Sequence, residues 1–271
     1  MSFRGIKMAK SFQDIKKFDP VWDKIIYTAK AAMEREPLLG PLINSNILHH
    51  NTFECSLSFR IALKLSSTEM PEQMLREISE EAMEDREISS SARADLVAVT
   101  ERDPACNSFI QPLLFFKGFQ AIQAYRVGHW LWKTGRKDLA YYFQSRISEL
   151  FGLDIHPAAV IGHGLMVDHA HSVVIGETAV VGNNVSMLHS VTLGGTGKQD
   201  DQRHPKIDDG VLIGAGSKVL GNIKVGYCSR IAAGSVVLHD IPPCKTVAGV
   251  PAKIVGSAGC DQPAISMDQL L

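Results

Sequence analysis

The sequence lacks any marked imbalance of charge. Its 271 residues include 28 Lys and Arg against 29 Asp and Glu, a net charge of −1, spread along the chain. This distribution favours neither nucleic acid nor an anionic membrane surface as a partner. Cysteine is scarce, and the five that occur have no CxxC or other paired spacing: Cys55, Cys106, Cys228, Cys244 and Cys260. We therefore expect thiols in a reducing compartment and chemistry on a small molecule.

Long hydrophobic runs are missing as well. The first twenty residues carry basic side chains but no apolar core behind them, so they do not match a secretory signal. The most apolar stretch, residues 112–132, is interrupted by five polar side chains: Lys117, Gln120, Gln123, Arg126 and His129. Such a stretch predicts a buried amphipathic helix and not a membrane span. The composition, 45% hydrophobic, is that of a globular protein, which we expect in the cytoplasm.

Apolar residues recur at helical spacing through the first half of the sequence. Helix start and stop signals divide it into four main stretches: 20–36, 71–85, 112–135 and 138–152. Asp19 and Pro20 suit the N-cap and first position of a helix, Pro71 is expected to open another in the same way, and Gly135 suits a helix end. We therefore predict an all-α domain over residues 1–152, whose apolar faces pack on one another or on another subunit.

The second half of the sequence has a repeat of six residues. Aliphatic or small residues stand at this spacing in two runs: Ile155, Ile161, Val167, Val173, Ala179, Val185 and Val191, then Ile207, Ile213, Val219, Val225, Ile231 and Val237. Hexapeptide periodicity is typical of a parallel β-helix, whereas a β-sandwich of short strands does not hold a fixed period. We therefore predict an α+β protein, with a β-helix of hexapeptide repeats over 153–256 and a flexible tail over 257–271.

The repeat also predicts how the coils are built. Three six-residue faces make a coil of about eighteen residues, and successive coils stack at about 4.8 Å, with the apolar residue of each repeat pointing inward. Val191 and Ile207 are sixteen residues apart, which is not a multiple of six. The segment between them is therefore predicted to leave the coil and return, carrying Arg203 and His204. Binding groups are common on such excursions from a rigid scaffold.

Segments in both halves resemble one known family. They are DIHPAAVIGHG, VDHAHSVVIGETAVVG, SVTLGGTG, QRHPKI, GAGSKVLGNIKVG, AGSVV and VAGVPAKIVG, with RDPA and KGFQAIQAYRVGHWLW in the helical half. On these segments the sequence resembles the bacterial serine acetyltransferases over nearly its whole length. The resemblance implies a left-handed β-helix and transfer of the acetyl group of acetyl-CoA to the hydroxyl of L-serine. It also implies that the product, O-acetyl-L-serine, is a precursor of cysteine.

An alcohol is a poor nucleophile until a base takes its proton. The resemblance assigns that role to His169, which follows Asp168 in VDHAHS. To Asp154 it assigns the carboxylate that fixes the tautomer of the histidine and stabilises its charged form. Asp154 and His169 are fifteen residues apart, close to one coil, so neighbouring coils can bring them together.

Serine has two charged groups that need partners. The resemblance implies Asp103, in RDPA, and Asp168 as partners of the ammonium group. It implies Arg203 and His204 as partners of the carboxylate, on an excursion that closes a site shared with a neighbouring subunit. From the residues alone, Asp103 would be a helix-end aspartate and Arg203 part of a solvated loop.

The candidate contacts of coenzyme A are small residues and one arginine. They are Gly195 in the GGTG turn, Ala215, Ala233 and, as a phosphate contact, Arg230. Small residues at coil corners are also what the fold requires, so these positions are open to both interpretations. No metal site is predicted.

Other functions are compatible with parts of the pattern. His171 and His189 are eighteen residues apart and could stack on adjacent coils, as in a β-helical carbonic anhydrase with a histidine-bound metal, although a third histidine is not evident. The acceptor could be a sugar or another alcohol. A structural or partner-binding protein with a degenerate site is a further alternative, against which the intact set of candidate residues argues.

The resemblance also implies partners. The sites of this superfamily lie between subunits, so we expect a homotrimer or a dimer of trimers, with L-cysteine as feedback inhibitor. In this family the tail commonly ends in isoleucine, which enters the active site of O-acetylserine sulfhydrylase. This sequence ends in Leu271, and the residues directly before it are not the acidic ones that often precede the terminal isoleucine, so we expect sulfhydrylase binding to be weakened.

Overall fold

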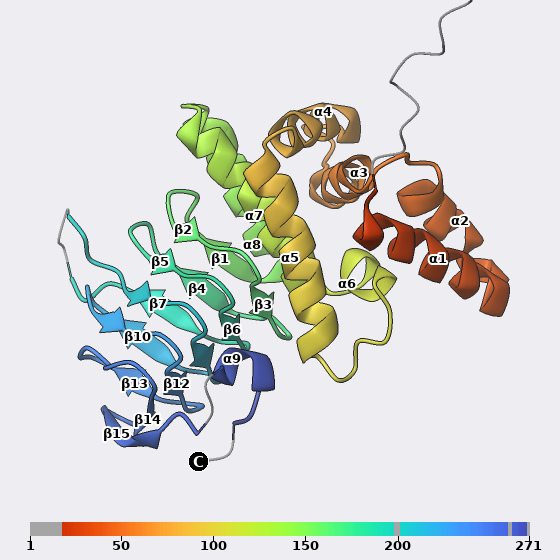
Figure 1. Ribbon diagram of the computed structural model, residues 1–271. Helices are drawn as coiled ribbons and strands as arrows, with labels where there is room; N and C mark the ends of the chain where they lie inside the picture. The colour runs from red at the N-terminus through yellow and green to blue at the C-terminus, as the bar shows by residue number, and fades with distance from the viewer. Residues whose placement is uncertain (1–17, 198–200, 260–261, 270–271) are drawn as a thin grey trace, which may run out of the picture.

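The computed structural model describes residues 18–197, 201–259 and 262–269. Helices make up the first half of the chain and stacked strands the second, and the two parts lie side by side (Figure 1). Within the described ranges, no helix combines the length and the apolar character needed to cross a membrane.

The first half is helical, as predicted. Its longer helices are α1 (Pro20–Arg35), α3 (Phe53–Leu65), α4 (Glu72–Met83), α5 (Arg86–Arg102), α7 (Lys117–Lys133) and α8 (Lys137–Phe151). Shorter segments are η2 (Pro37–Leu39), α2 (Gly40–Ile43), η3 (Asn44–Leu48) and α6 (Ile110–Leu114). Asp19 caps α1 by accepting a hydrogen bond from the Trp22 amide at 3.1 Å. Pro71 differs from the prediction, because its backbone is extended and α4 begins one residue later.

The single helix predicted over 112–135 is broken in two. Helix α6 ends at Leu114 and α7 begins at Lys117, because the backbone of Phe116 is extended, with φ −88° and ψ 108°. The break allows the side chain of Phe116 to pack against a small apolar cluster that includes Met166 of the β-helix. It also places the first turn of α7 directly against the β-helix.

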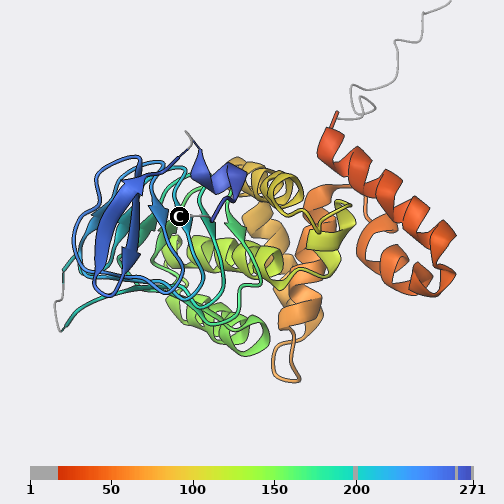
Figure 2. The ribbon, with the colours of Figure 1, turned by 90° about the horizontal axis from the view of Figure 1, so that it is seen from below.

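The second half is a β-helix with three parallel faces, as predicted, and it matches a left-handed β-helix. Sheet A contains β1 (Leu153–Ile155), β4 (Val173–Ile175), β7 (Thr192–Gly194), β10 (Lys218–Leu220) and β13 (Val236–Val237). Sheet B contains β2 (Val160–Ile161), β5 (Val180–Val181), β8 (Lys206–Ile207) and β11 (Lys224–Val225). Sheet C contains β3 (Met166–Val167), β6 (Ser186–Met187), β9 (Leu212–Ile213), β12 (Arg230–Ile231), β14 (Lys245–Gly249) and β15 (Ala252–Ser257), the last of which is antiparallel. Figure 2 shows the coils from below.

The chain turns between sheets at three columns of corners. We call them the C–A corner, the A–B corner and the B–C corner, after the sheets that each connects. All thirteen residues of the predicted six-residue repeat are buried, which confirms that they form the core.

The repeat nevertheless conceals an irregularity in the first coil. Val167 pairs with Met187, a step of twenty residues, whereas Ile207 pairs with Val225, a step of eighteen. Two extra residues therefore lie in the C–A corner at residues 168–172. The six-residue spacing continues across this insertion because two positions of each repeat are apolar, and Val173 falls on the second of them.

The predicted excursion is present at the A–B corner. Val181 pairs with Ile207, a step of 26 residues, which is eight more than a regular coil. The extra residues leave the coil between β7 and β8 and return to the same corner.

Buried polar contacts fasten the helical part to the β-helix. The carboxylate of Asp95 on α5 pairs with Arg126 on α7 at 2.7 Å and accepts a hydrogen bond from the Leu165 amide at 2.9 Å. Arg126 in turn donates to the carbonyl of Gly162 at 2.7 Å. Because the charges are mutually paired and buried, this contact fixes how α5 and α7 meet the first coil.

The described part of the tail packs on the molecule, and its mobility in isolation stays a prediction. A short helix, α9 (Pro263–Ser266), lies against the outer face of sheet C and beside α5 (Figures 1 and 2). Pro263 and Ala264 are buried there. Two small apolar residues are enough for this contact because polar side chains on the same face of sheet C also bind the tail. Leu271 lies outside the described residues.

Candidate active site

The candidate base lies in the two-residue insertion at the C–A corner. His169 has a left-handed backbone, with φ 54°, and its side chain is 73% exposed. Its Nε2 atom is 3.6 Å from a carboxylate oxygen of Asp168. His171, on the same corner, lies 3.4 Å through Nδ1 from the amine of Lys117 on α7. The insertion therefore raises an Asp-His pair out of the regular coil.

A second histidine lies beside the first on the next coil. The rings of His169 and His189 are edge to face, with centroids 5.8 Å apart. The Nδ1 atom of His189 is buried and has no hydrogen-bond partner among the described residues. The eighteen-residue spacing predicts that His171 and His189 stack on adjacent coils. Their backbones do so, since the Ser190 amide donates to the carbonyl of His171 at 2.7 Å, but it is the ring of His169 that lies against His189. Within the described ranges, no group of three or more His, Cys, Asp or Glu side chains could hold a metal ion.

Asp154 lies on the outer side of sheet A, below the C–A corner. It pairs in register with Val174, and its carboxylate accepts a hydrogen bond from the Gln144 amide at 2.8 Å. In the described part of the chain, no hydrogen bond or ion pair joins Asp154 to His169. The structure therefore brings Asp154 and His169 to the same region of sheet A, near the C–A corner, without a direct hydrogen bond or ion pair between them among the described residues.

Asp103 forms the C-cap of α5, close to the same corner. Its carboxylate accepts from the Ala105 amide at 2.8 Å, and its carbonyl accepts from the Cys106 amide at 2.9 Å. The side chain of Cys106 packs on Met166, two residues before Asp168. The structure thus brings together the loops that carry the two predicted partners of the ammonium group.

The fit between α7 and this corner leaves no free space. A Cβ atom on Gly118 would lie 2.1 Å from the carbonyl oxygen of Val167 and 3.1 Å from the Cβ of Ala170. Glycine is therefore required for α7 to approach the corner that carries His169. Sequence analysis missed the roles of Gly118, His189 and Gln144, since each depends on a contact between distant segments.

Two of the coenzyme A candidates lie in the same column of corners as the histidines, on the two coils that follow. Ala215 and Ala233 lie on successive C–A corners, where the Gly234 amide donates to the carbonyl of Ala215 at 2.7 Å. A Cβ on Gly214 would lie 2.5 Å from the amide nitrogen of Ala233. At these two coils the C–A corner therefore presents a narrow track of backbone and methyl groups, which suits a long thin ligand.

The carboxylate candidates lie at the A–B corner. Arg203 pairs with Glu177 at 2.5 Å, and a Cβ on Gly176 would overlap the ring of His204. Nδ1 of His204 accepts from the Thr178 amide at 3.2 Å. Burial lowers the pKa of His204, and the positive charge of Arg203 lowers it further, so the ring is neutral near pH 7 with its hydrogen on Nε2.

One chain does not bring the two groups of candidates together. The C–A and A–B corners lie at opposite ends of β4, so Arg203 and His204 are separated from His169 by the width of sheet A. Gly195 lies with them, since a Cβ there would lie 3.4 Å from the carbonyl oxygen of Arg203.

Arg230 differs from the other coenzyme A candidates because it is buried. It lies on β12 with 7% of its surface exposed, and Nε donates to the Thr246 hydroxyl at 3.2 Å. Nη1 donates to the carbonyl of Asp268 in the tail at 3.0 Å. In this arrangement Arg230 holds the tail.

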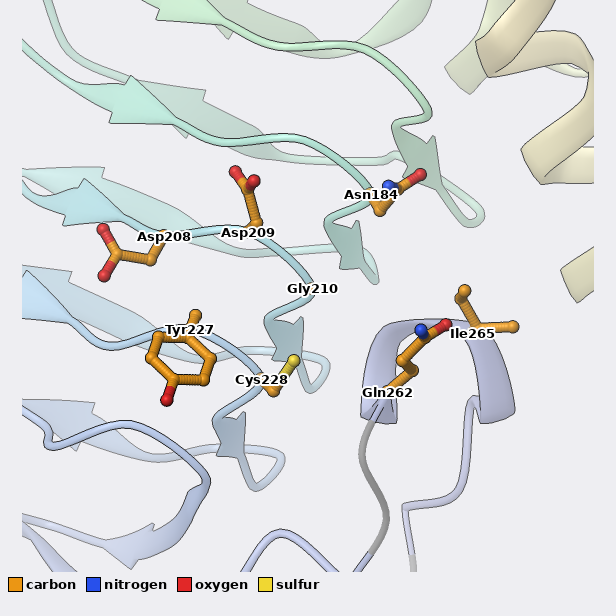
Figure 3. A pocket seen from close by; sticks show the side chains of 8 residues that line it. All are labelled: Asn184, Asp208, Asp209, Gly210, Tyr227, Cys228, Gln262 and Ile265. Atoms are coloured by element: carbon orange, nitrogen blue, oxygen red, sulfur yellow. The ribbon is translucent and has the colours of Figure 1, made fainter.

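A pocket lies elsewhere, at the B–C corner. It has a volume of about 570 Å³ and is open to solvent between that corner and the tail. Figure 3 shows its lining: Asn184, Asp208, Asp209, Gly210, Tyr227, Cys228, Gln262 and Ile265. None of the predicted site residues lines this pocket.

Comparison with known proteins agrees with the arrangement of the chain. A family model for the N-terminal region of serine acetyltransferase matches residues 21–124. The serine acetyltransferase of Escherichia coli (strain K12) is 52% identical over 250 residues, which cover 92% of this chain and 92% of that protein.

Solved structures match over the same length. A crystal structure of serine acetyltransferase from Brucella abortus strain S19 in complex with coenzyme A is 52% identical, with a TM-score of 0.88, and the match covers 91% of this chain and 99% of that one. A serine acetyltransferase in complex with cysteine is 50% identical, with a TM-score of 0.91, and the match covers 93% of this chain and 98% of that one.

Proposed function

Since the chain belongs to the serine acetyltransferase family, we propose that it transfers the acetyl group of acetyl-CoA to L-serine with His169 as general base. The observation that carries this proposal is the column at the C–A corner. His169, His189, Ala215 and Ala233 lie on successive coils of that column. A base and a track for coenzyme A therefore share one edge.

The chemistry follows from this placement. His169 takes the hydroxyl proton as the serine oxygen attacks the thioester carbonyl, giving a tetrahedral intermediate. The carbon–sulfur bond then breaks, and the thiolate of coenzyme A takes the proton back from the imidazolium. His189 lies beside the base and is placed to donate a hydrogen bond to the developing oxyanion.

Carboxylates surround the base on two sides. Asp103 and Asp168 bind the ammonium group of serine, supported by the packing of the Cys106 loop on Met166. Asp154, which accepts a hydrogen bond from Gln144, is the proposed carboxylate partner that orients His169.

The second group of candidates requires another subunit. Arg203, His204 and Gly195 occupy the A–B corner, so they can bind the serine carboxylate and coenzyme A only at a corner of a neighbouring chain. A closed ring of three subunits pairs each C–A corner with an A–B corner, and Val160, an apolar residue that is 51% exposed, lies on sheet B beside the A–B corner. We propose this trimer, extended to a dimer of trimers by the helical parts.

Two small-molecule ligands and one protein partner complete the proposal. L-cysteine shares the ammonium and carboxylate groups of serine and is expected to compete for the same residues, and a relative in complex with cysteine supports this. O-acetylserine sulfhydrylase remains a weak partner through the tail. A cytoplasmic location fits the thiols of Cys55, Cys106 and Cys244, none of which is in a disulfide.

A thiol-release assay tests the proposal. At fixed acetyl-CoA, we expect free coenzyme A to appear rapidly with L-serine and at background rate with galactosides or maltose. Rapid release with a sugar and none with serine would replace this proposal by the alternative, an O-acetyltransferase of sugars or other alcohols.

A further inference from the structure

The described tail makes three kinds of contact with the outer face of the molecule. The hydroxyl of Ser186, on β6, donates to the carbonyl of Ala264 at 2.7 Å. Arg230, on β12, donates to the carbonyl of Asp268 at 3.0 Å. The side chain of Met267 packs against the cluster formed by Val99, Cys106 and Met166. The tail is therefore fastened at both ends of α9.

Two of these contacts converge on the flanks of Asp103. On one side, Arg102 donates to the same hydroxyl of Ser186 at 3.0 Å, so the tail carbonyl and Arg102 share one anchor. On the other side, Met267 packs against the cluster that contains Cys106, three residues after Asp103.

The loop between these flanks is held by its own hydrogen bonds and by the side chain of Gln111, which accepts from the amides of Asn107 and Ser108. Asp103 is the last capping residue of α5, and its carboxylate and carbonyl bind the amides of the next turn. Asp103 is only partly buried, and Ala105 is exposed. Because the Cys106 amide donates to the carbonyl of Asp103 at 2.9 Å, a contact that holds the cluster around Cys106 also restricts Asp103.

We propose that the docked tail braces the Asp103–Cys106 loop, and that Met267 is a positioning residue for the binding of serine. The proposal rests on the assignment of Asp103 to the serine site. Met267 does not touch the substrate, and it acts through Cys106. Docking of the tail is thereby coupled to the affinity for serine and not to the affinity for acetyl-CoA.

Three full-length variants test the brace. Met267→Gln keeps the length of the side chain but places a polar group in the apolar cluster, and Met267→Leu keeps the apolar contact. Ile265→Gln is the matched control, since Ile265 lies two residues before Met267, on α9, and lines the pocket (Figure 3). Steady-state kinetics and amide hydrogen exchange over residues 103–108 are measured for each.

We expect Met267→Gln to raise the KM for serine about fivefold while the KM for acetyl-CoA and kcat change less than about twofold. Exchange over residues 103–108 should become faster in the same variant, and Met267→Leu and Ile265→Gln should behave like the parent protein. Unchanged exchange in Met267→Gln would overturn the brace, whatever the kinetics show. Faster exchange with an unchanged KM for serine would keep the brace and overturn the role of Asp103 in the serine site.

Discussion

Gly118 lies so close to Val167 that a Cβ on the glycine would be 2.1 Å from the carbonyl oxygen of the valine. The first turn of α7 therefore packs directly against the corner that carries Asp168 and His169. A contact with backbone cannot be relieved by rotating a side chain, so the corner or the helix must move if Gly118 is replaced.

We expect Gly118→Ala to destabilise the protein by about 1–3 kcal/mol, the usual cost of overpacking, and to raise the KM for serine. Gly128→Ala on the same helix is the control, because its Cβ would lie 3.4 Å from the Cβ of Phe143, in ordinary contact. Urea unfolding and steady-state kinetics measure both effects. Equal stability and activity of the two variants would contradict the close fit of α7 to the corner.

Asp103 and Asp168 are expected to act on serine and not on coenzyme A, because each is proposed to pair with the ammonium group. Replacing a charged partner of an ammonium group costs about 1.5–3 kcal/mol, so Asp103→Asn and Asp168→Asn should raise the KM for serine by about ten- to a hundredfold. The KM for acetyl-CoA should change little. A larger effect on acetyl-CoA than on serine would refute the assignment.

The pH dependence of stability should carry a contribution from His204. Burial lowers its pKa below the usual 6.5, so the unfolded chain binds a proton more readily than the folded one. The contribution is complete above pH 6.5 and is lost as the pH falls through the lowered pKa of the folded state. Unfolding free energies of the parent and of His204→Asn should be measured between about pH 5 and pH 8. The difference, parent minus variant, should be constant above pH 6.5 and should fall as the pH is lowered. Parallel curves would show that His204 does not titrate in this range.

Much of the fold could be predicted from the sequence because the six-residue repeat reports directly on an inward-facing column. The register of the first coil could not be predicted in this way. Val173 keeps the six-residue spacing across the insertion although it occupies a different place in its coil from Val167. The two extra residues precede His171, so the eighteen-residue spacing still aligns the backbones of His171 and His189, but it does not reveal that the ring of His169 lies against His189.

The site was predicted in part for the same reason. Motif residues such as His169 and Asp168 could be named from the sequence, but their supports come from elsewhere in the chain. Gln144 reaches Asp154 from α8, and the tail reaches Arg230 from beyond the β-helix. No local pattern marks such contacts, since they depend on how the helical part and the tail pack on the coils.

The turnover of His169→Ala tests the central claim most directly, with His171→Ala as a matched control on the same corner. A positioned general base contributes about 10²- to 10⁴-fold, so His169→Ala should lose that much of kcat in the serine-dependent release of coenzyme A. Its affinity for acetyl-CoA should stay close to that of the parent, and His171→Ala should keep most of its activity. A His169→Ala variant that retains more than half of the parent rate would contradict the account.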